Sequence, residues 1–91
     1  LMVDIGARHA VQHSGRSLLP IGIKRIEGQF RKGDVVALRD PEDVELARGL
    51  SNYSSSDLQK ICGLRTEQIK NLLGAVPYEE VIHRDNLVLV V

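Results

Sequence analysis

The residues of this chain with the most distinctive chemistry are three histidines and one cysteine. His9 and His13 are four residues apart, so a helix would present both imidazoles on one face, as many zinc sites require. The third protein ligand of such a site is missing from the pattern. His13 also lies beside Ser14-Gly15, where a helix is expected to end. We therefore predict that both histidines lie on a solvated surface and bind no metal.

Three other patterns were tested for catalytic or phosphate-binding chemistry. His83 and Asp85 could form an acid–base pair, but no nucleophile lies within reach in the sequence, so both are interpreted as hydrogen-bonding turn residues. Cys62 occupies an apolar helical stripe, which is typical of a packed thiol. Gly22 and Gly28 have the wrong interval for a phosphate-binding loop, and no Gly-Lys-Ser follows. The sequence predicts no catalytic residue, cofactor site or metal site in this chain.

Basic residues are concentrated in the first third of the chain, although its net charge is zero. Residues 1–34 hold six Lys or Arg against three Asp or Glu, whereas residues 35–91 hold six against nine. An anionic partner would be attracted to the basic part, where glycines allow close backbone approach. The candidate RNA or partner surface consists of Gly15, Arg16, Ser17, Gly22, Lys24, Arg25, Arg31 and Lys32. A solvated charged face accounts for the same residues, so both interpretations stay open.

Aromatic content argues against one common form of RNA binding. The chain contains only Phe30, Tyr53 and Tyr78. Proteins that bind single strands usually stack bases on aromatic side chains, and Phe30 is expected in the core. Any RNA surface would therefore recognise shape and phosphates rather than stacked bases.

The totals describe one small folded domain. Ninety-one residues are too few for two hydrophobic cores, which need roughly 50 residues each, and no apolar stretch approaches the ~20 residues of a membrane span. A single cysteine forms no internal disulfide, which favours a reducing cytoplasm. Residues 1–5 have a strand pattern rather than that of a start or signal peptide. We expect residues 1–91 to be one domain of a longer chain.

Hydrophobic spacing and turn residues predict the first elements. A strand is expected over residues 1–5, followed by a short helix that ends before Ser14-Gly15. Pro20 prevents a helix from continuing, so a strand is expected from Ile21 onward. Val35–Leu38 is a continuous apolar run, which is typical of a strand buried on both faces.

The second half of the chain predicts one more strand pair and two helices. After a polar turn, residues 44–50 return as a strand with Arg48 on its apolar face, either as a ligand contact or reaching past the core to a carboxylate. A helix over residues 54–62 and a second one capped by Thr66 would form a hairpin that covers part of the sheet. Residues 87–91 are wholly apolar and would lie deep in the sheet. The class is mainly β with short helices (α+β), in β-α-β-β-β-α-α-β order.

Several of these motifs recur in the order found in a known family. The string SLLPIGIKRIEGQFRKGDVVAL at residues 17–38, followed by Gly49, Tyr53-Ser54-Ser55 and residues 81–89, resembles the C-terminal PUA domain of the bacterial glutamate 5-kinases. The resemblance spans nearly the whole chain. It implies a PUA-like pseudo-barrel whose ends are closed by helices, a topology that agrees with the predicted order.

The resemblance also implies how the work is divided in the parent protein. In that family the PUA domain follows an amino-acid-kinase domain, which phosphorylates L-glutamate in the first step of proline biosynthesis, so ATP and magnesium are expected upstream. The PUA domain would be a non-catalytic regulatory or interaction module that contacts its own kinase domain, within a parent that could be a homo-oligomer. In RNA-modifying proteins of this fold, the surface corresponding to residues 15–25 contacts RNA, which keeps an RNA-binding module as the alternative. A free-standing enzyme is a third hypothesis, favoured only by His83 and Asp85.

Overall fold

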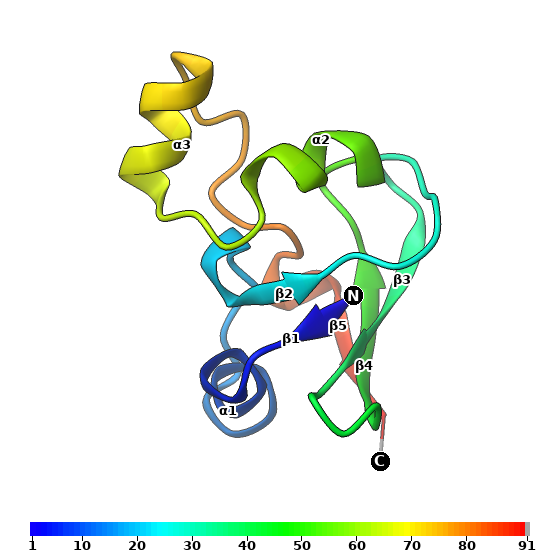
Figure 1. Ribbon diagram of the computed structural model, residues 1–91. Helices are drawn as coiled ribbons and strands as arrows, with labels where there is room; N and C mark the ends of the chain where they lie inside the picture. The colour runs from blue at the N-terminus through cyan, green and yellow to red at the C-terminus, as the bar shows by residue number, and fades with distance from the viewer. Residues whose placement is uncertain (91) are drawn as a thin grey trace.

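The computed structural model describes residues 1–90 and contains one mixed five-stranded sheet with short helices (Figure 1). In chain order the elements are β1 (Met2–Val3), α1 (Ile5–Ser14), η1 (Pro20–Gly22), β2 (Ile23–Arg25), β3 (Val35–Arg39), β4 (Glu45–Leu50), α2 (Ser55–Ile61), α3 (Thr66–Leu73), η2 (Arg84–Asn86) and β5 (Leu87–Leu89). The predicted order of strands and α-helices and the α+β class are confirmed. None of the helices within residues 1–90 is long and apolar enough to cross a membrane.

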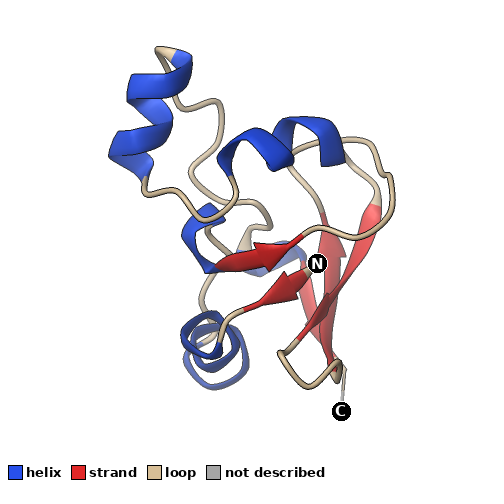
Figure 2. Cartoon of the chain, viewed as in Figure 1, coloured by secondary structure: helices blue, strands red, loops and turns tan. Residues whose placement is uncertain are grey.

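The sheet is closed on itself by a bridge between its two edges. The strands lie in the order β2-β1-β3-β4-β5, with β1 and β3 parallel and the other neighbours antiparallel (Figure 2). The segment leading into β2 meets the segment leading into η2 and β5, because the Leu18 N–H donates to the Ile82 carbonyl at 3.0 Å. The Val81 N–H donates back to the Leu18 carbonyl at 2.8 Å. These bonds join the edge regions into a pseudo-barrel.

A single hydrophobic core lies inside this arrangement. Its largest fully buried apolar side chains are Val3, Leu18, Leu38, Leu46, Leu58, Ile61, Ile69, Val81 and Ile82. They come from β1, from the segments joined by the Leu18–Ile82 bridge, from β3 and β4, and from both α2 and α3. Both ends of the chain therefore contribute to the same core, and hydrophobic burial couples them.

Strand β3 is buried on one face rather than on two. Val36 and Leu38 point into the core, whereas the Val35 side chain is 65% exposed. The prediction of a doubly buried strand was wrong. Continuous apolar sequence is typical of strands covered on both faces, but here the helices in Figure 2 lie above and beside the sheet and leave one face of β3 open.

A β-bulge in β4 reverses the predicted facing of Arg48. Leu38 pairs with Ala47 but Arg39 pairs with Glu45, so Leu46 is an extra residue on β4. The bulge turns Ala47 inward and Arg48 outward, against the prediction that Arg48 lies on the apolar face. Arg48 does meet a carboxylate, since its guanidinium donates to Glu45 at 2.9 and 3.2 Å, but it does so in solvent.

Two further strand predictions were wrong in position. Residues 20–22 form a 3₁₀ turn, in which Pro20 suits the first position, and the strand begins only at Ile23. Residues 87–89 form an edge strand rather than a deeply buried one, and the Val88 side chain is 71% exposed. Val91, the last residue of the predicted strand, lies outside the described residues.

The two α-helices after β4 behave differently from each other. Helix α2 begins at the predicted cap, where the Ser54 hydroxyl accepts from the Asp57 N–H at 3.2 Å. Helix α3 is capped at Arg65 and not at Thr66, because the Gln68 side chain accepts from the Arg65 N–H at 2.9 Å. Figure 1 shows α3 standing apart from the sheet, where Ile69 is buried but Leu72 and Leu73 are exposed. The predicted hairpin does not cover the sheet with both helices.

Candidate anion-binding cavity between α1 and η1

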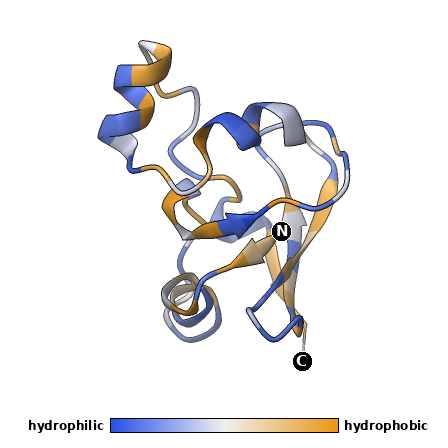
Figure 3. Ribbon diagram, in the orientation of Figure 1, coloured by the Kyte–Doolittle hydropathy of each residue, from blue (hydrophilic) through white to orange (hydrophobic). Residues whose placement is uncertain are grey.

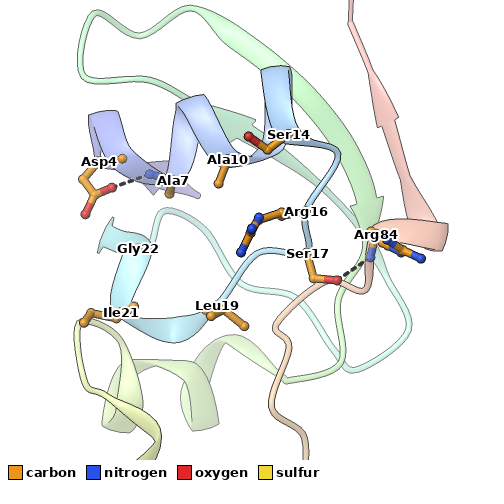
Figure 4. Close-up of a pocket in the computed structure, with 11 residues that line it drawn as sticks. Asp4, Ala7, Ala10, Ser14, Arg16, Ser17, Leu19, Ile21, Gly22 and Arg84 are labelled. Carbon is orange, nitrogen blue, oxygen red and sulfur yellow. Dashed lines mark hydrogen bonds between the residues drawn. The ribbon is translucent and has the colours of Figure 1, made fainter.

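A cavity of about 800 Å³ lies between α1 and η1 (Figure 4). Its lining comes from three separate parts of the chain: the start and end of α1, the η1 segment, and η2. The lining residues are Asp4, Gly6, Ala7, Ala10, Ser14, Arg16, Ser17, Leu19, Ile21, Gly22 and Arg84. Only three of the eight residues of the predicted surface are among them, namely Arg16, Ser17 and Gly22.

The two ends of α1 set the walls of the cavity. Asp4 begins the helix as its N-cap, because its Oδ1 accepts from the Ala7 N–H at 2.7 Å. Gly15 ends the helix in the left-handed conformation, with φ of 57°, which glycine adopts without steric cost. The Arg16 N–H then donates to the Ala10 carbonyl at 3.0 Å. The chain therefore turns back along α1 and brings Arg16 over the cavity.

Gly22 allows η1 to lie directly against α1. A Cβ atom at Gly22 would lie 2.6 Å from the Cβ of Ala7, so any other residue would push the helix away. The Asp4 N–H also donates to the Gly22 carbonyl at 2.9 Å. This part of the cavity is consequently formed by backbone and small side chains, which leaves room for a ligand between α1 and η1.

One guanidinium group, that of Arg16, gives the cavity a positive end, whereas the Arg84 side chain is directed away from it in Figure 4 and lies 4.0 Å from Asp85. Figure 4 shows the Arg16 side chain directed into the space between α1 and η1. Within residues 1–90 no carboxylate lies within ion-pair distance of Arg16. Arg84 lies at the mouth of the cavity, where its backbone N–H donates to the Ser17 hydroxyl at 2.8 Å. Arginine forms paired hydrogen bonds with phosphate and carboxylate oxygens, so this end of the cavity suits an anion.

A carboxylate limits this positive character to one end. Asp4 lines the opposite end of the cavity, where its Oδ1 is already occupied by the helix cap. A ligand that fills the whole cavity would therefore meet negative charge near Asp4 and positive charge near Arg16. An anionic group is expected to bind at the end near Arg16, Ser17 and Arg84.

The remaining residues of the predicted surface lie elsewhere. Gly15 adjoins the cavity as the helix cap, and Lys24 and Arg25 continue along β2 outside its lining. Arg25 pairs with Glu27 at 2.6 Å. Arg31 lines a separate cavity of about 760 Å³ with residues 54–56.

Lys32 is held by an aromatic side chain on another face. Its ammonium lies 4.5 Å from the centre of the Tyr78 ring and donates a hydrogen bond to the Tyr78 hydroxyl. Both residues line a third cavity, of about 310 Å³, together with Tyr53. Burial raises the pKa of Tyr53, whose hydroxyl donates to the carbonyl of Tyr78 and accepts from its N–H. The predicted surface is thus distributed over several faces of the molecule.

The predicted surface did not include two residues that line the cavity, Asp4 and Arg84. Arg84 is separated from Ser17 by 67 positions and reaches it only through the Leu18–Ile82 bridge, so no local pattern could have revealed it. Asp4 carried a readable signal, since an aspartate directly before a helical pattern is a preferred N-cap.

The other chemically distinctive residues have structural partners. The rings of His9 and His13 lie 5.1 Å apart, and residues 1–90 contain no group of three or more potential metal ligands. The His83 Nδ1 accepts from the Asp85 N–H at 3.1 Å, as the turn interpretation predicted. Cys62 is partly buried against the core.

Comparison with known proteins identifies the family. The profile described as "PUA domain" matches residues 1–73, so the chain belongs to the PUA domain family. It is similar to a PUA domain from Aeropyrum pernix K1, solved as a tartrate complex, with 28% identity and a TM-score of 0.66 over 90% of this chain and 39% of that one. A conserved PUA domain protein from Thermoplasma acidophilum shares the fold, with a TM-score of 0.60 over 65% of this chain and 38% of that one.

The particular proteins most relevant to this chain are glutamate 5-kinases. The chain is 53% identical over 88 residues to the enzyme of Dictyoglomus thermophilum, covering 97% of this chain and 24% of the relative. It is 55% identical over 89 residues to that of Nostoc sp. PCC 7120, covering 98% and 24%. The predicted resemblance is confirmed. The chain spans about a quarter of the length of these relatives.

Proposed function

We propose that this chain is the C-terminal PUA module of a glutamate 5-kinase and acts as a non-catalytic regulatory or interaction module. The observation that carries the proposal is a match of about half of all positions, over nearly the whole chain, to a quarter of the length of such kinases. ATP, Mg²⁺ and glutamate would bind upstream of Leu1. The parent would be cytoplasmic, in keeping with the single cysteine.

Removing this module from the full-length protein tests the proposal. Glutamate phosphorylation should persist after residues 1–91 are deleted, because no reacting group is assigned to them, while feedback inhibition by the pathway product proline, which the resemblance to glutamate 5-kinases implies, should change. Rates measured at several proline concentrations, before and after deletion, give both quantities. A truncated kinase domain that folds but no longer phosphorylates glutamate would contradict the non-catalytic role, and unchanged proline inhibition would contradict regulation.

A second candidate function, RNA binding, is favoured by the cavity between α1 and η1. Arg16 points into this cavity and Arg84 stands at its mouth, so RNA phosphates could pair with both. The basic residues Lys24 and Arg25 follow on β2 and would extend such a surface. The opposing observation is Asp4, whose charge would repel a phosphate placed deeper in the cavity.

Titration with a structured RNA at two salt concentrations tests this second function. Arg16→Ala and Arg84→Ala should each weaken binding and lower the salt dependence by about one phosphate contact. Lys70→Ala on α3 is the matched control and should leave both unchanged. Binding that is undetectable at low salt, or equal in all variants, would exclude RNA binding at this cavity. Loss only in Lys24→Ala and Arg25→Ala variants would place the surface on β2 instead.

A further inference from the structure

An apolar surface covers the open face of β3, β4 and β5. We define the outer sheet face as Val35 and Ala37 on β3, Leu50 on β4 and Val88 on β5. Val35 lies directly opposite Leu50, and both are exposed, at 65% and 42%. Ala37 and Val88 flank Arg48 in the next row. In Figure 3 hydrophobic colour runs along β3, which carries Val35 and Ala37. Contiguous exposed apolar residues of this kind mark interaction sites.

The charged residue that lies between two members of the outer sheet face is ion-paired on its own strand. Arg48 lies between Ala37 and Val88 and is paired with Glu45 on its own strand. This pair raises the pKa of Arg48 and lowers that of Glu45, so both stay charged and matched at neutral pH. The face therefore offers an apolar surface of low net charge, and a packed domain would not have to bury an unpaired charge.

The start of the chain lies beside the outer sheet face. The Leu1 nitrogen donates to the Ala37 carbonyl at 2.7 Å, and the Arg39 N–H donates to the Leu1 carbonyl at 2.8 Å. The N–H and C=O of a strand residue face the same edge, so the Ala37 N–H also faces β1. Strand β1 runs parallel to β3, and residues before Leu1 would therefore continue past Ala37 toward Val35.

A cavity lies where these preceding residues would run. It measures about 280 Å³ and separates the start of β1 from the chain that follows β2. Its lining residues are Leu1, Glu27, Gly28, Gln29, Phe30, Val35, Val36, Ala37 and Arg39. Because a strand advances roughly 3.3 Å per residue, about two residues would carry the chain from Leu1 to the level of Val35.

We propose that the residues before Leu1 extend β1 through this cavity and that the upstream domain of the same chain packs on the outer sheet face. The proposal rests on the proposed function, because it requires a longer chain. In the similar glutamate 5-kinases, about three quarters of the length lies outside the region that this chain matches. The upstream domain is favoured over a second copy, because it is covalently tethered through residues that would run past Ala37 toward Val35, beside this face.

Hydrogen exchange on the full-length protein tests the proposal. The variant Val35→Lys/Val88→Lys places two charges on the outer sheet face. It should raise the exchange rate of the upstream peptides that cover this face, and of residues 35–37, by about tenfold or more. Val44→Lys is the matched control, since Val44 is also an exposed valine, at 53%, but lies at the turn before β4. It should leave exchange unchanged.

Three further readouts make the outcome decisive. Peptides containing Leu38 and Ala47 report whether the fold survives, and if they lose protection the milder Val88→Ser variant replaces the double variant. Equal exchange in all folded variants would overturn the proposal. An effect that disappears on dilution would also overturn it, because the occupant would then be a second copy. Failure of the proposed function is separable, since it would appear as a full-length protein that does not phosphorylate glutamate, or whose inhibition by proline is unchanged when residues 1–91 are deleted.

Discussion

At the residue scale, one buried carboxylate organises the turn between β3 and β4. Asp40 is 4% exposed, and its Oδ1 accepts from the N–H groups of Val44 and Glu42 at 3.0 and 2.9 Å. Arg8 on α1 approaches the other oxygen at 3.4 Å. The Val44 and Glu42 N–H groups, with the nearby Arg8, lower the pKa of Asp40 despite its burial. The turn therefore depends on a charged carboxylate and links the sheet to α1.

The protonation of Asp40 predicts acid sensitivity. Because its pKa is lower in the folded than in the unfolded chain, its charge stabilises the fold above about pH 4, and this contribution is lost as pH falls through the folded value. Asp40→Asn should lower the melting temperature at pH 7, and the difference from wild type should shrink toward pH 3. Melting curves across this range measure it. A constant difference at all pH values would contradict a role for the charge.

Glycine at position 22 predicts a second residue-scale effect. Gly22→Ala places a Cβ 2.6 Å from that of Ala7 and should cost about 1–3 kcal/mol as α1 is displaced. Gly6→Ala, inside α1 with its nearest contact at 3.4 Å, is the control and should stabilise by up to about 1 kcal/mol. Urea unfolding of both variants gives the comparison. Equal effects would mean that η1 does not need its close approach to α1.

At the element scale, local caps decide where helices begin and a bulge decides how strands face. Asp4 and Ser54 each accept a backbone N–H at a helix start. The extra residue Leu46 shifts the facing of β4, so that Arg48 and Leu50 lie on the open face. Without this bulge the strict alternation of a strand would bury Arg48. The outer sheet face therefore depends on one irregularity in one strand.

The cap of α2 gives a prediction at this scale. Ser54→Ala removes the hydroxyl that accepts from the Asp57 N–H and should destabilise the domain by about 1 kcal/mol. Ser56→Ala lies within the helix and removes a solvent-exposed hydroxyl 3.2 Å from that of Ser54 while leaving the cap itself in place, so its effect should stay within a few tenths of a kcal/mol, roughly the difference in helix propensity. Chemical denaturation distinguishes them. A loss at Ser56 as large as that at Ser54 would show that the hydroxyl contributes through something other than capping.

At the scale of the whole molecule, the two ends of the chain are joined through one bridge. Leu18 pairs with Ile82, and both side chains lie in the core. The same bridge brings Arg84 to the cavity beside Arg16. The stability of the barrel and the composition of the cavity thus depend on contacts between residues more than 60 positions apart.

Adjacent leucines test this long-range connection. Leu18→Ala should cost about 2–5 kcal/mol, because the side chain is fully buried and its removal leaves a cavity. Leu19→Ala, at a side chain that is 44% exposed, should cost within about 0.5 kcal/mol. Thermal unfolding of the two variants supplies the measurement. Similar losses at both positions would argue against the bridge as the site that closes the sheet.

Local signals predicted several boundaries correctly, but the strand expected over residues 1–5 was wrong in extent: β1 spans only Met2–Val3, because Asp4 caps α1 and Ile5 already lies in the helix. Gly15 ends α1, Ser54 begins α2, and the element order follows from hydrophobic spacing, because caps and turns depend on residues within about four positions. The resemblance at residues 17–38 indicated the family as well, since it needs only the order of residues. The distribution of the predicted surface could not be foreseen, because Arg31 and Lys32 are close to Arg25 in sequence but line other cavities.

The sequence by itself therefore determined the class, the family and the order of elements in this protein. The tertiary structure decided which faces are covered: Val35 and Val88 are as apolar as core residues, yet no part of residues 1–90 covers them. It also decided that Arg84 completes the cavity. The physical reason is the same in both cases, because burial and proximity arise from pairing between distant segments, and a one-dimensional pattern does not contain that pairing.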